Sequence, residues 1–173
     1  MPDAGFPATV RAAAPKHAPA VARLLSERWG SQAMVSRGAR HDLAGCPAMV
    51  AEADGRLVGL ATYVVSTDEA ELLSLDALCE GRGVGSALLD AVVGAAQAAG
   101  ARRLVLVTSN DNLRALRFYQ RRGFRLVALH PGVVDRARLV KPSIPTVGND
   151  GIPVHDELEL ARDLDAPPNG RGG

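Results

Sequence analysis

A glycine-rich segment constrains the fold of this chain more than any other feature. It separates a stretch of mixed apolar and polar residues from a long stretch with one apolar face, and it reads Leu78-Cys79-Glu80-Gly81-Arg82-Gly83-Val84-Gly85-Ser86. Glycines allow the backbone to approach a ligand closely, and the first-turn N–H groups of a following helix attract anions. The segment therefore predicts a turn from a strand into a helix that can hold a phosphate, although a purely structural tight turn would also use these glycines.

The flanking residues predict the strand and the helix that such a turn joins. Between Ser86 and Ala99 the apolar residues recur on one broad face, and Gly100 follows as a helix stop. Asp54-Gly55 supplies the positive φ angles of a tight hairpin turn between two apolar runs. The strands expected before the glycine-rich turn are residues 49–53, 57–65 and 71–78.

The rest of the chain supplies the other predicted elements. Leu104 to Val107 form a continuous apolar run, which is typical of a strand covered on both faces. Residues 30–47 hold glycines among polar residues and predict a loop or a short irregular helix, and the Pro- and Gly-rich residues 131–153 predict a connection without a regular helix. The remaining expected elements are strands at 8–13, 124–129 and 155–160, a helix between Pro15 and about Trp29, and a helix at 112–122.

Two nucleotide-binding classes fit the glycine-rich turn poorly. A Walker A loop needs Gly-Lys followed by Ser or Thr, which this segment lacks. Gly81 and Gly83 match the first two glycines of the dinucleotide-binding pattern G-x-G-x-x-G, although Ser86 stands at its last position. However, that fold places the turn after the first strand of a parallel βαβ unit, whereas three strands in hairpin order precede it here.

Length and charge limit the class of protein further. With 173 residues, 47% of them apolar, residues 1–173 fit a single domain with an ordered core at about 8–160 and flexible ends at 1–7 and 166–173. A net charge of +1 and only three Phe, two Tyr and one Trp provide neither the field nor the stacking platform that nucleic-acid binding needs. Five arginines lie close together in the sequence, namely Arg114, Arg117, Arg121, Arg122 and Arg125. Such a local cluster could still bind a phosphate, or it could form a solvated helix face.

Cysteine usage and hydropathy indicate the compartment. Cys46 and Cys79 are too few and too far apart to predict a disulfide framework or a metal site, so both are expected to be reduced thiols. The sequence has no apolar run typical of a signal peptide and no uninterrupted apolar segment of bilayer length. A cytoplasmic protein with no membrane partner and no metal is therefore expected.

A second segment points to a family. It reads Asn112-Leu113-Arg114-Ala115-Leu116-Arg117-Phe118-Tyr119-Gln120-Arg121-Arg122-Gly123-Phe124. With the glycine-rich turn, in this order, it resembles the GNAT superfamily of acyltransferases, in which a Gln/Arg-x-x-Gly-x-Gly/Ala loop cradles the CoA pyrophosphate and an Asn-x-x-Ala-x-x-Phe-Tyr-x-x-x-Gly-Phe helix lines the pantetheine arm. The resemblance covers about residues 8–160. It implies an α+β, three-layer fold with a mixed, mostly antiparallel central sheet of six to seven strands flanked by helices.

The resemblance also implies a cofactor site. The backbone of the strand ending at Leu78 would contact pantetheine, and Asn112 would contact CoA, although Asn is equally suited to cap a helix. Glu80 stands where the family usually has Gln or Arg, and an acid beside a pyrophosphate is unfavourable, so no role passes to it. The pyrophosphate would be held by the turn itself, at Gly81, Arg82, Gly83, Val84, Gly85 and Ser86.

Two catalytic residues are predicted. Tyr119 falls where the family often places the general acid that protonates the departing CoA thiolate, and a phenol of pKa near 10 suits that transfer; a packed Tyr beside Phe118 is the alternative. A base must also take a proton from the amine, because only a free amine attacks a thioester. Relatives place their base on the strand face that Leu78 shares. Strand parity puts Asp76 and Ser74 on that face and turns Glu71 away, so the resemblance implies Asp76 as base, with Ser74 as a relay; a structural acceptor is the alternative.

The resemblance thus implies an N-acetyltransferase that moves the acetyl group of acetyl-CoA to an amine by direct attack, without a covalent intermediate. The acceptor would be a small-molecule or peptide amine. An acyl-CoA-binding sensor without catalysis and a nucleotide-binding regulatory domain are the rival functions. A homodimer could form through an exposed last strand.

Overall fold

The computed structural model describes residues 8–165 and divides the chain into two compact units, Met1–Arg102 and Arg103–Gly173. The ends predicted to be flexible, residues 1–7 and 166–173, lie outside the described residues. That the two units behave as a single domain stays a prediction.

The first unit is built on four antiparallel strands. Their order is β1-β4-β5-β6, with the hairpin of β4 and β5 in the middle. Asp54 (φ 49°) and Gly55 (φ 72°) form its turn, which confirms the predicted tight hairpin. The strands are β1 (Thr9–Ala12), β4 (Ala48–Ala53), β5 (Arg56–Val65) and β6 (Glu69–Ala77).

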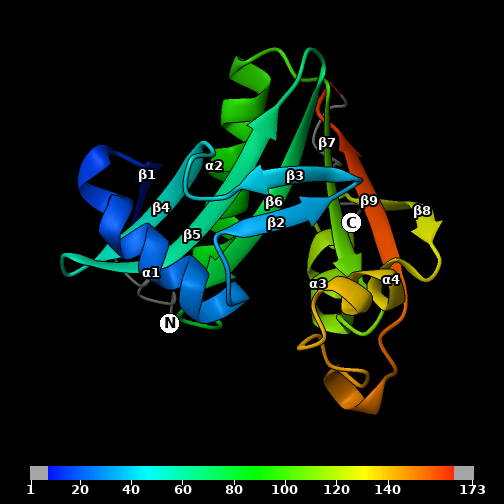
Figure 1. The fold of residues 1–173 in the computed structure, drawn as a ribbon. Coiled ribbons are helices and arrows are strands. Elements are labelled where there is room, and N and C mark those ends of the chain that lie inside the picture. Colours follow the sequence, from blue (N-terminus) through cyan, green and yellow to red (C-terminus); the bar gives the residue numbers. More distant parts are fainter. Residues whose placement is uncertain (1–7, 166–173) are drawn as a thin grey trace. The chain divides into compact units, whose positions relative to one another are not determined.

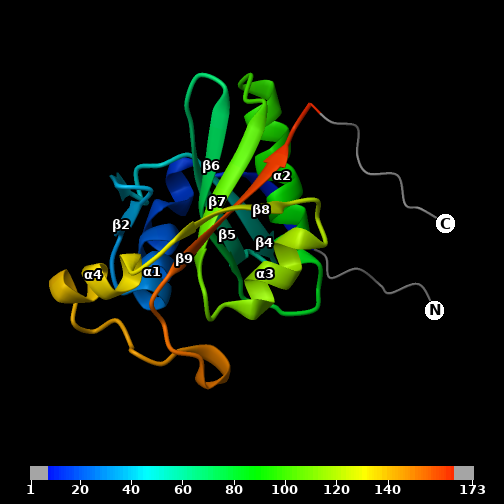
Figure 2. The ribbon, with the colours of Figure 1, turned by 90° about the vertical axis from the view of Figure 1, so that its right-hand side faces the viewer.

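Two helices cover opposite faces of this sheet (Figures 1 and 2). Helix α1 (Ala18–Trp29) follows the short 3-10 helix η1 (Pro15–His17) and buries Leu25 in a cluster that includes Leu60 of β5. Helix α2 (Val84–Ala98) packs closely on the other side, since a Cβ at Gly59 would lie only 2.7 Å from Val84 Cγ1. Burial of these aliphatic faces is the main force holding the unit together.

The prediction of a loop or irregular helix at 30–47 is wrong. The segment contains a two-stranded hairpin of β2 (Ala33–Ser36) and β3 (Ala39–Asp42). Its turn is Arg37-Gly38, with φ angles of 48° and 79°, and Arg-Gly is a weaker hairpin signal than Asn-Gly or Asp-Gly. Met34 packs against the same core cluster as Leu43, so tertiary burial stabilises strands that the local sequence barely indicates.

The second unit has three antiparallel strands in the order β7-β9-β8, namely β7 (Arg103–Ser109), β9 (Glu157–Asp163) and β8 (Arg125–His130). Leu104 and Val105 are fully buried, which confirms the predicted covered strand. The last strand pairs on both sides, so the expectation of an exposed last strand is wrong. Helices α3 (Leu113–Gln120) and α4 (Val133–Val140) lie on opposite sides of β7 and β9 (Figure 2).

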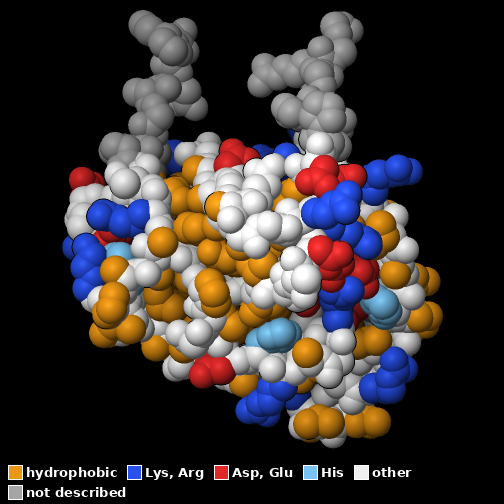
Figure 3. Space-filling view, turned by 90° about the horizontal axis from the view of Figure 1, so that it is seen from above, with side chains coloured by type: hydrophobic (Ala, Val, Ile, Leu, Met, Phe, Trp, Pro, Cys, Tyr) orange, Lys and Arg blue, Asp and Glu red, His pale blue; other side chains and the backbone are white. Residues whose placement is uncertain are grey.

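These elements confirm the predicted α+β class. Outside the β2–β3 hairpin, residues 8–165 form seven strands, four in the first unit and three in the second, which agrees with the predicted six to seven. On the face drawn in Figure 3, Lys and Arg side chains lie among Asp and Glu side chains, as a net charge of +1 suggests. None of the helices between residues 8 and 165 is long and apolar enough to cross a membrane.

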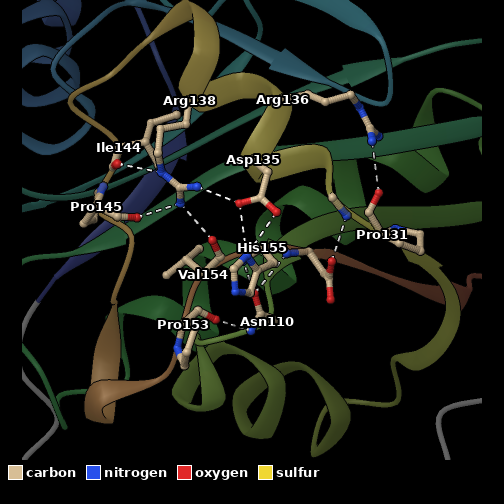
Figure 4. Close-up of polar contacts among 12 residues, drawn as sticks. Asn110, Pro131, Asp135, Arg136, Arg138, Ile144, Pro145, Pro153, Val154 and His155 are labelled. Atoms are coloured by element: carbon tan, nitrogen blue, oxygen red, sulfur yellow. Dashed lines mark hydrogen bonds and ion pairs between the residues drawn. The ribbon is translucent and has the colours of Figure 1, made fainter.

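The prediction of no regular helix in 131–153 is also wrong, because α4 lies within it. The prolines stand outside the helix, and Gly132 begins it with a φ of 66°, so the interior keeps its hydrogen bonds. Arg138 ties the following loop to α4, donating to the carbonyl oxygens of Ile144, Pro145 and Val154 at 2.8–3.0 Å and to Asp135 at 2.7 Å (Figure 4). One arginine therefore fixes a loop whose own sequence lacks a repeating pattern.

Gly148 is expected to tolerate no side chain. Asp111 is buried and accepts hydrogen bonds from the backbone and side chain of Asn149, at 2.9 and 2.7 Å. A Cβ at Gly148 would overlap the Asp111 carboxylate and lie 2.7 Å from Val154 Cγ2. We expect Gly148→Ala to lower the free energy of unfolding by about 1–3 kcal/mol, measured by urea denaturation.

The control for this variant is Gly94→Ala. Gly94 is exposed in α2, and a Cβ there would meet nothing within 4 Å. The same chemical change should therefore raise stability by about 0.5–1 kcal/mol, because Ala is the better helix former. An equal effect of the two variants would contradict the close packing around Asp111.

Candidate active site

The glycine-rich turn has the geometry of an anion site. Gly81 (φ 70°) and Gly83 (φ 75°) are both left-handed, and a Cβ at either would meet nothing within 4 Å. Gly83 is the N-cap of α2, no side chain caps the helix, and its first turn carries no acidic residue. The first-turn N–H groups, from Val84 to Ser86, are those that a helix's own hydrogen bonds do not use. A negatively charged group is stabilised at such an end.

Leu78 lies one residue beyond β6 and is 42% exposed. Its N–H donates to Val58 O at 2.9 Å, which extends the β5–β6 pairing into the turn. The thiols of Cys79 and Cys46 form no disulfide. Between residues 8 and 165, no group of three or more His, Cys, Asp and Glu side chains is arranged to hold a metal ion.

Asp76 lies two residues before Leu78 and is held by the end of α1. Trp29 Nε1 donates to Asp76 Oδ2 at 2.9 Å, and Arg28 Nε lies 4.0 Å from Oδ1. Burial raises the pKa of Asp76, while the Trp29 hydrogen bond and the Arg28 charge lower it less strongly. A carboxylate whose pKa is raised toward neutrality binds a proton more readily, which suits a general base.

A bulge in β6 overturns the parity argument against Glu71. Thr62 pairs with Ser74 but Tyr63 pairs with Leu72, so Leu73 has no partner on β5. The register on β5 is unbroken: residues 60, 62 and 64 share a face, and their partners are Asp76, Ser74 and Glu71. Glu71 therefore shares the face of Asp76, contrary to the prediction.

The two other polar groups on this face have partners of their own. Ser74 Oγ lies 2.7 Å from Thr62 Oγ1, and both residues are buried. Glu71 is buried, accepts from Ser36 Oγ at 2.5 Å and has Arg37 Nη1 3.9 Å from its second oxygen. Glu71 thus joins the β2–β3 hairpin to β6 and is a second acid that sequence reasoning set aside. A bulge is a property of strand pairing, so no local sequence signal revealed it.

The second unit holds the other two predicted site residues on α3. Asn112 is the N-cap and accepts from Ala115 N at 3.1 Å through Oδ1, which confirms the capping role. Tyr119 is buried, and its ring meets those of Phe118 and Phe124 edge-on, with centroids 5.1 and 5.5 Å apart. This packing fixes the phenol ring, and the acid role of its hydroxyl stays a prediction.

The predicted arginine cluster is partly used within α3 itself. The guanidinium of Arg122 lies 3.7 Å from the centroid of the Phe118 ring, and its Nη1 donates to Phe118 O at 2.9 Å. Arg122 therefore stabilises the C-terminal turn of the helix through a cation–π contact and a carbonyl bond.

Comparisons with known proteins agree with this arrangement. The family model described as Acetyltransferase (GNAT) family matches residues 18–124. The uncharacterized protein YxbD of Bacillus subtilis (strain 168) is 38% identical over 147 residues, covering 83% of this chain and 91% of YxbD.

Two solved structures share the fold at low sequence identity. A GNAT family acetyltransferase from Elizabethkingia anophelis with acetyl-CoA bound has a TM-score of 0.65 at 17% identity, covering 90% of this chain and 97% of that one. The ribosomal-protein-S18-alanine N-acetyltransferase from Escherichia coli has a TM-score of 0.65 at 16% identity, covering 96% and 99%. The match of the family model over more than half of the chain and the likeness to YxbD show that this protein belongs to the GNAT family of acetyltransferases.

Proposed function

We propose that this protein is an N-acetyltransferase that moves the acetyl group of acetyl-CoA to an amine by direct attack. The uncapped start of α2, with left-handed glycines at positions 81 and 83, carries the proposal. The backbone N–H groups of this helix start can donate to a pyrophosphate, and the chain belongs to an acetyltransferase family. The E. anophelis neighbour, which holds acetyl-CoA, supports this choice of cosubstrate.

The CoA-binding residues of this proposal are those of the two sequence motifs. In the first unit, the backbone from Gly81 to Ser86 binds the pyrophosphate, aided by Arg82, and the backbone at Leu78 meets the pantetheine. In the second unit, Asn112 contacts CoA through groups that its capping bond leaves available, since the cap uses Oδ1 as acceptor.

The proposed chemistry transfers one acetyl group and moves two protons. Asp76 takes a proton from the acceptor ammonium, and the free amine attacks the thioester carbonyl carbon. An N–C bond forms, the C–S bond breaks, and Tyr119 donates its proton to the departing thiolate. The second proton that the attacking nitrogen loses returns through water to the phenolate of Tyr119, and Asp76 releases its proton to solvent. The raised pKa of Asp76 favours the first proton transfer.

The acceptor in this proposal is a primary amine of a small molecule or a peptide. The E. coli neighbour is named for a protein alanine, so both classes belong in a test. The proposed assay measures free CoA thiol released from acetyl-CoA across a panel of small amines, amino acids and peptides. Amine-dependent release is expected for at least one acceptor class.

Two outcomes would contradict the proposal. Binding of acetyl-CoA without release by any amine would favour an acyl-CoA sensor instead. Retention of NAD or ATP in preference to acetyl-CoA would favour a nucleotide-binding domain and remove the basis for transfer altogether.

Gly83→Ala is expected to weaken acetyl-CoA binding about tenfold, which is about 1.4 kcal/mol. Alanine at a φ of 75° is strained, so the turn must move its N–H groups away from the pyrophosphate. Isothermal titration calorimetry with acetyl-CoA measures the loss of affinity.

Gly100→Ala is the matched control. Gly100 has a φ of 89° after the C-terminal end of α2, and a Cβ there also meets nothing within 4 Å. Both variants should lose about 1 kcal/mol of stability, but Gly100→Ala should bind acetyl-CoA normally. Equal affinity in the two variants would contradict the anion site at Gly83.

A further inference from the structure

One hydrogen bond connects the end of α1 to the proposed base. Trp29 Nε1 donates to Asp76 Oδ2 at 2.9 Å across 47 positions of sequence. Trp29 is the last residue of α1, and Gly30 ends the helix in the left-handed conformation, with its N–H bonded to Ser26 O at 3.0 Å. The indole is thereby held on a defined helix terminus and not on a free loop.

The two carboxylate oxygens of Asp76 have different neighbours. Oδ2 accepts from the indole, whereas Arg28 Nε lies 4.0 Å from Oδ1, beyond hydrogen-bond range. The Asp76 side chain is only 12% exposed, while Trp29 is 40% exposed. Oδ1 is therefore the oxygen with lone pairs left to accept a proton.

We propose that Trp29 is a positioning residue for the transfer reaction: its indole N–H fixes the Asp76 carboxylate so that Oδ1 faces the amine. This inference rests on the proposed function, because it assumes that Asp76 is the base. The indole itself transfers no proton, because it has an N–H donor and no acceptor.

Among residues 8–165, Arg28 is the charged group that acts on the pKa of Asp76, which makes the effect of the Trp29 bond measurable. Helix α1 contributes Arg28, and β5 places the uncharged Leu60 opposite. On the β2–β3 hairpin, Arg37 is paired with Glu69 at 2.6 Å. Because a hydrogen bond from Trp29 favours the ionised carboxylate, removing it should raise the pKa of Asp76, as the contribution of Trp29 to that pKa indicates.

The first experiment follows the ionisation of Asp76 without any substrate. Trp29→Phe keeps a ring but removes the donor, and NMR of the side-chain carboxyl carbon should show the Asp76 midpoint moving to higher pH. Trp29 is the only Trp of the chain, so native fluorescence should show a step at the same pH as the Asp76 titration. Asp76→Asn should abolish that step, and Arg28→Gln should move it to higher pH by a smaller amount.

The second experiment measures kcat/KM against pH with the best acceptor of the amine panel. In Trp29→Phe the acidic limb should move to higher pH together with the Asp76 midpoint. On the plateau kcat/KM should fall about threefold to tenfold, because the carboxylate loses its fixed orientation. A merely structural bond would change stability but would leave the acidic limb in place.

The outcomes separate this inference from the proposed function. An Asp76 midpoint that does not move in Trp29→Phe, or a fluorescence step that persists in Asp76→Asn, overturns the positioning role, whatever the activity. A shifted midpoint with an unchanged acidic limb, and full activity in Asp76→Asn, overturns Asp76 as the base. Matching shifts of midpoint and limb support both.

Discussion

An Asp76→Asn variant is expected to lose about 10²- to 10³-fold in kcat/KM, the range that general-base catalysis supplies. Asn can still accept the Trp29 hydrogen bond, but it cannot take a proton from the ammonium. Acetyl-CoA affinity should be unchanged, because the anion site lies in the turn that follows. The measurement is amine-dependent release of CoA thiol in the native chain and the variant.

The pH dependence of this step has a definite sign. The pKa of Asp76 is raised in the folded chain, mainly by burial, so the carboxylate is charged only above that raised value and activity should fall as pH decreases through it. The same shift means that the ionised carboxylate costs stability above the unfolded-state pKa. Asp76→Asn should therefore be at least as stable as the native chain at neutral pH. A loss of activity in this variant would then not result from unfolding.

The control for this variant is Asp90→Asn. Asp90 is exposed on α2, and the same change of charge and size there should leave kcat/KM within about twofold.

Glu71→Gln tests the second acid on the shared face of β6. Full activity in Asp76→Asn with a large loss in Glu71→Gln would transfer the base role to Glu71.

A Tyr119→Phe variant is expected to lose about 10²-fold in kcat, at the lower end of general-acid effects, with little change in KM for acetyl-CoA. The ring contacts with Phe118 and Phe124 remain after the change, so the aromatic cluster should keep its packing. The departing thiolate then has to take its proton from water. Initial rates at saturating acetyl-CoA measure this loss.

Tyr63→Phe is the matched control, because Tyr63 is the other tyrosine of the chain and is also buried. It removes the same single oxygen from β5 and should leave kcat nearly unchanged. If Tyr119→Phe keeps kcat within about twofold, Tyr119 is a packing residue of α3 and the acid must be sought elsewhere.

Local sequence chemistry determined the elements that carry the proposed cofactor site. Asp54-Gly55 has the positive φ angles of the hairpin, Gly83 stands at the start of α2, and Asn112 caps α3. Each of these features depends on contacts within about four residues, which a sequence pattern records directly. The buried run beginning at Leu104 could be predicted for a similar reason, since a strand covered on both faces is apolar throughout.

Tertiary structure alone decided how the polar residues around the proposed chemistry are oriented. The unpaired Leu73 in β6 turns Glu71 to the face of Asp76, and the bulge exists only in the pairing with β5. The Trp29–Asp76 bond spans 47 positions. Arg138 of α4 holds the chain that follows the helix by donating hydrogen bonds to three of its carbonyl oxygens. Turns and caps are local interactions that the chain specifies residue by residue, whereas strand register and side-chain partners arise only when distant segments pack against one another.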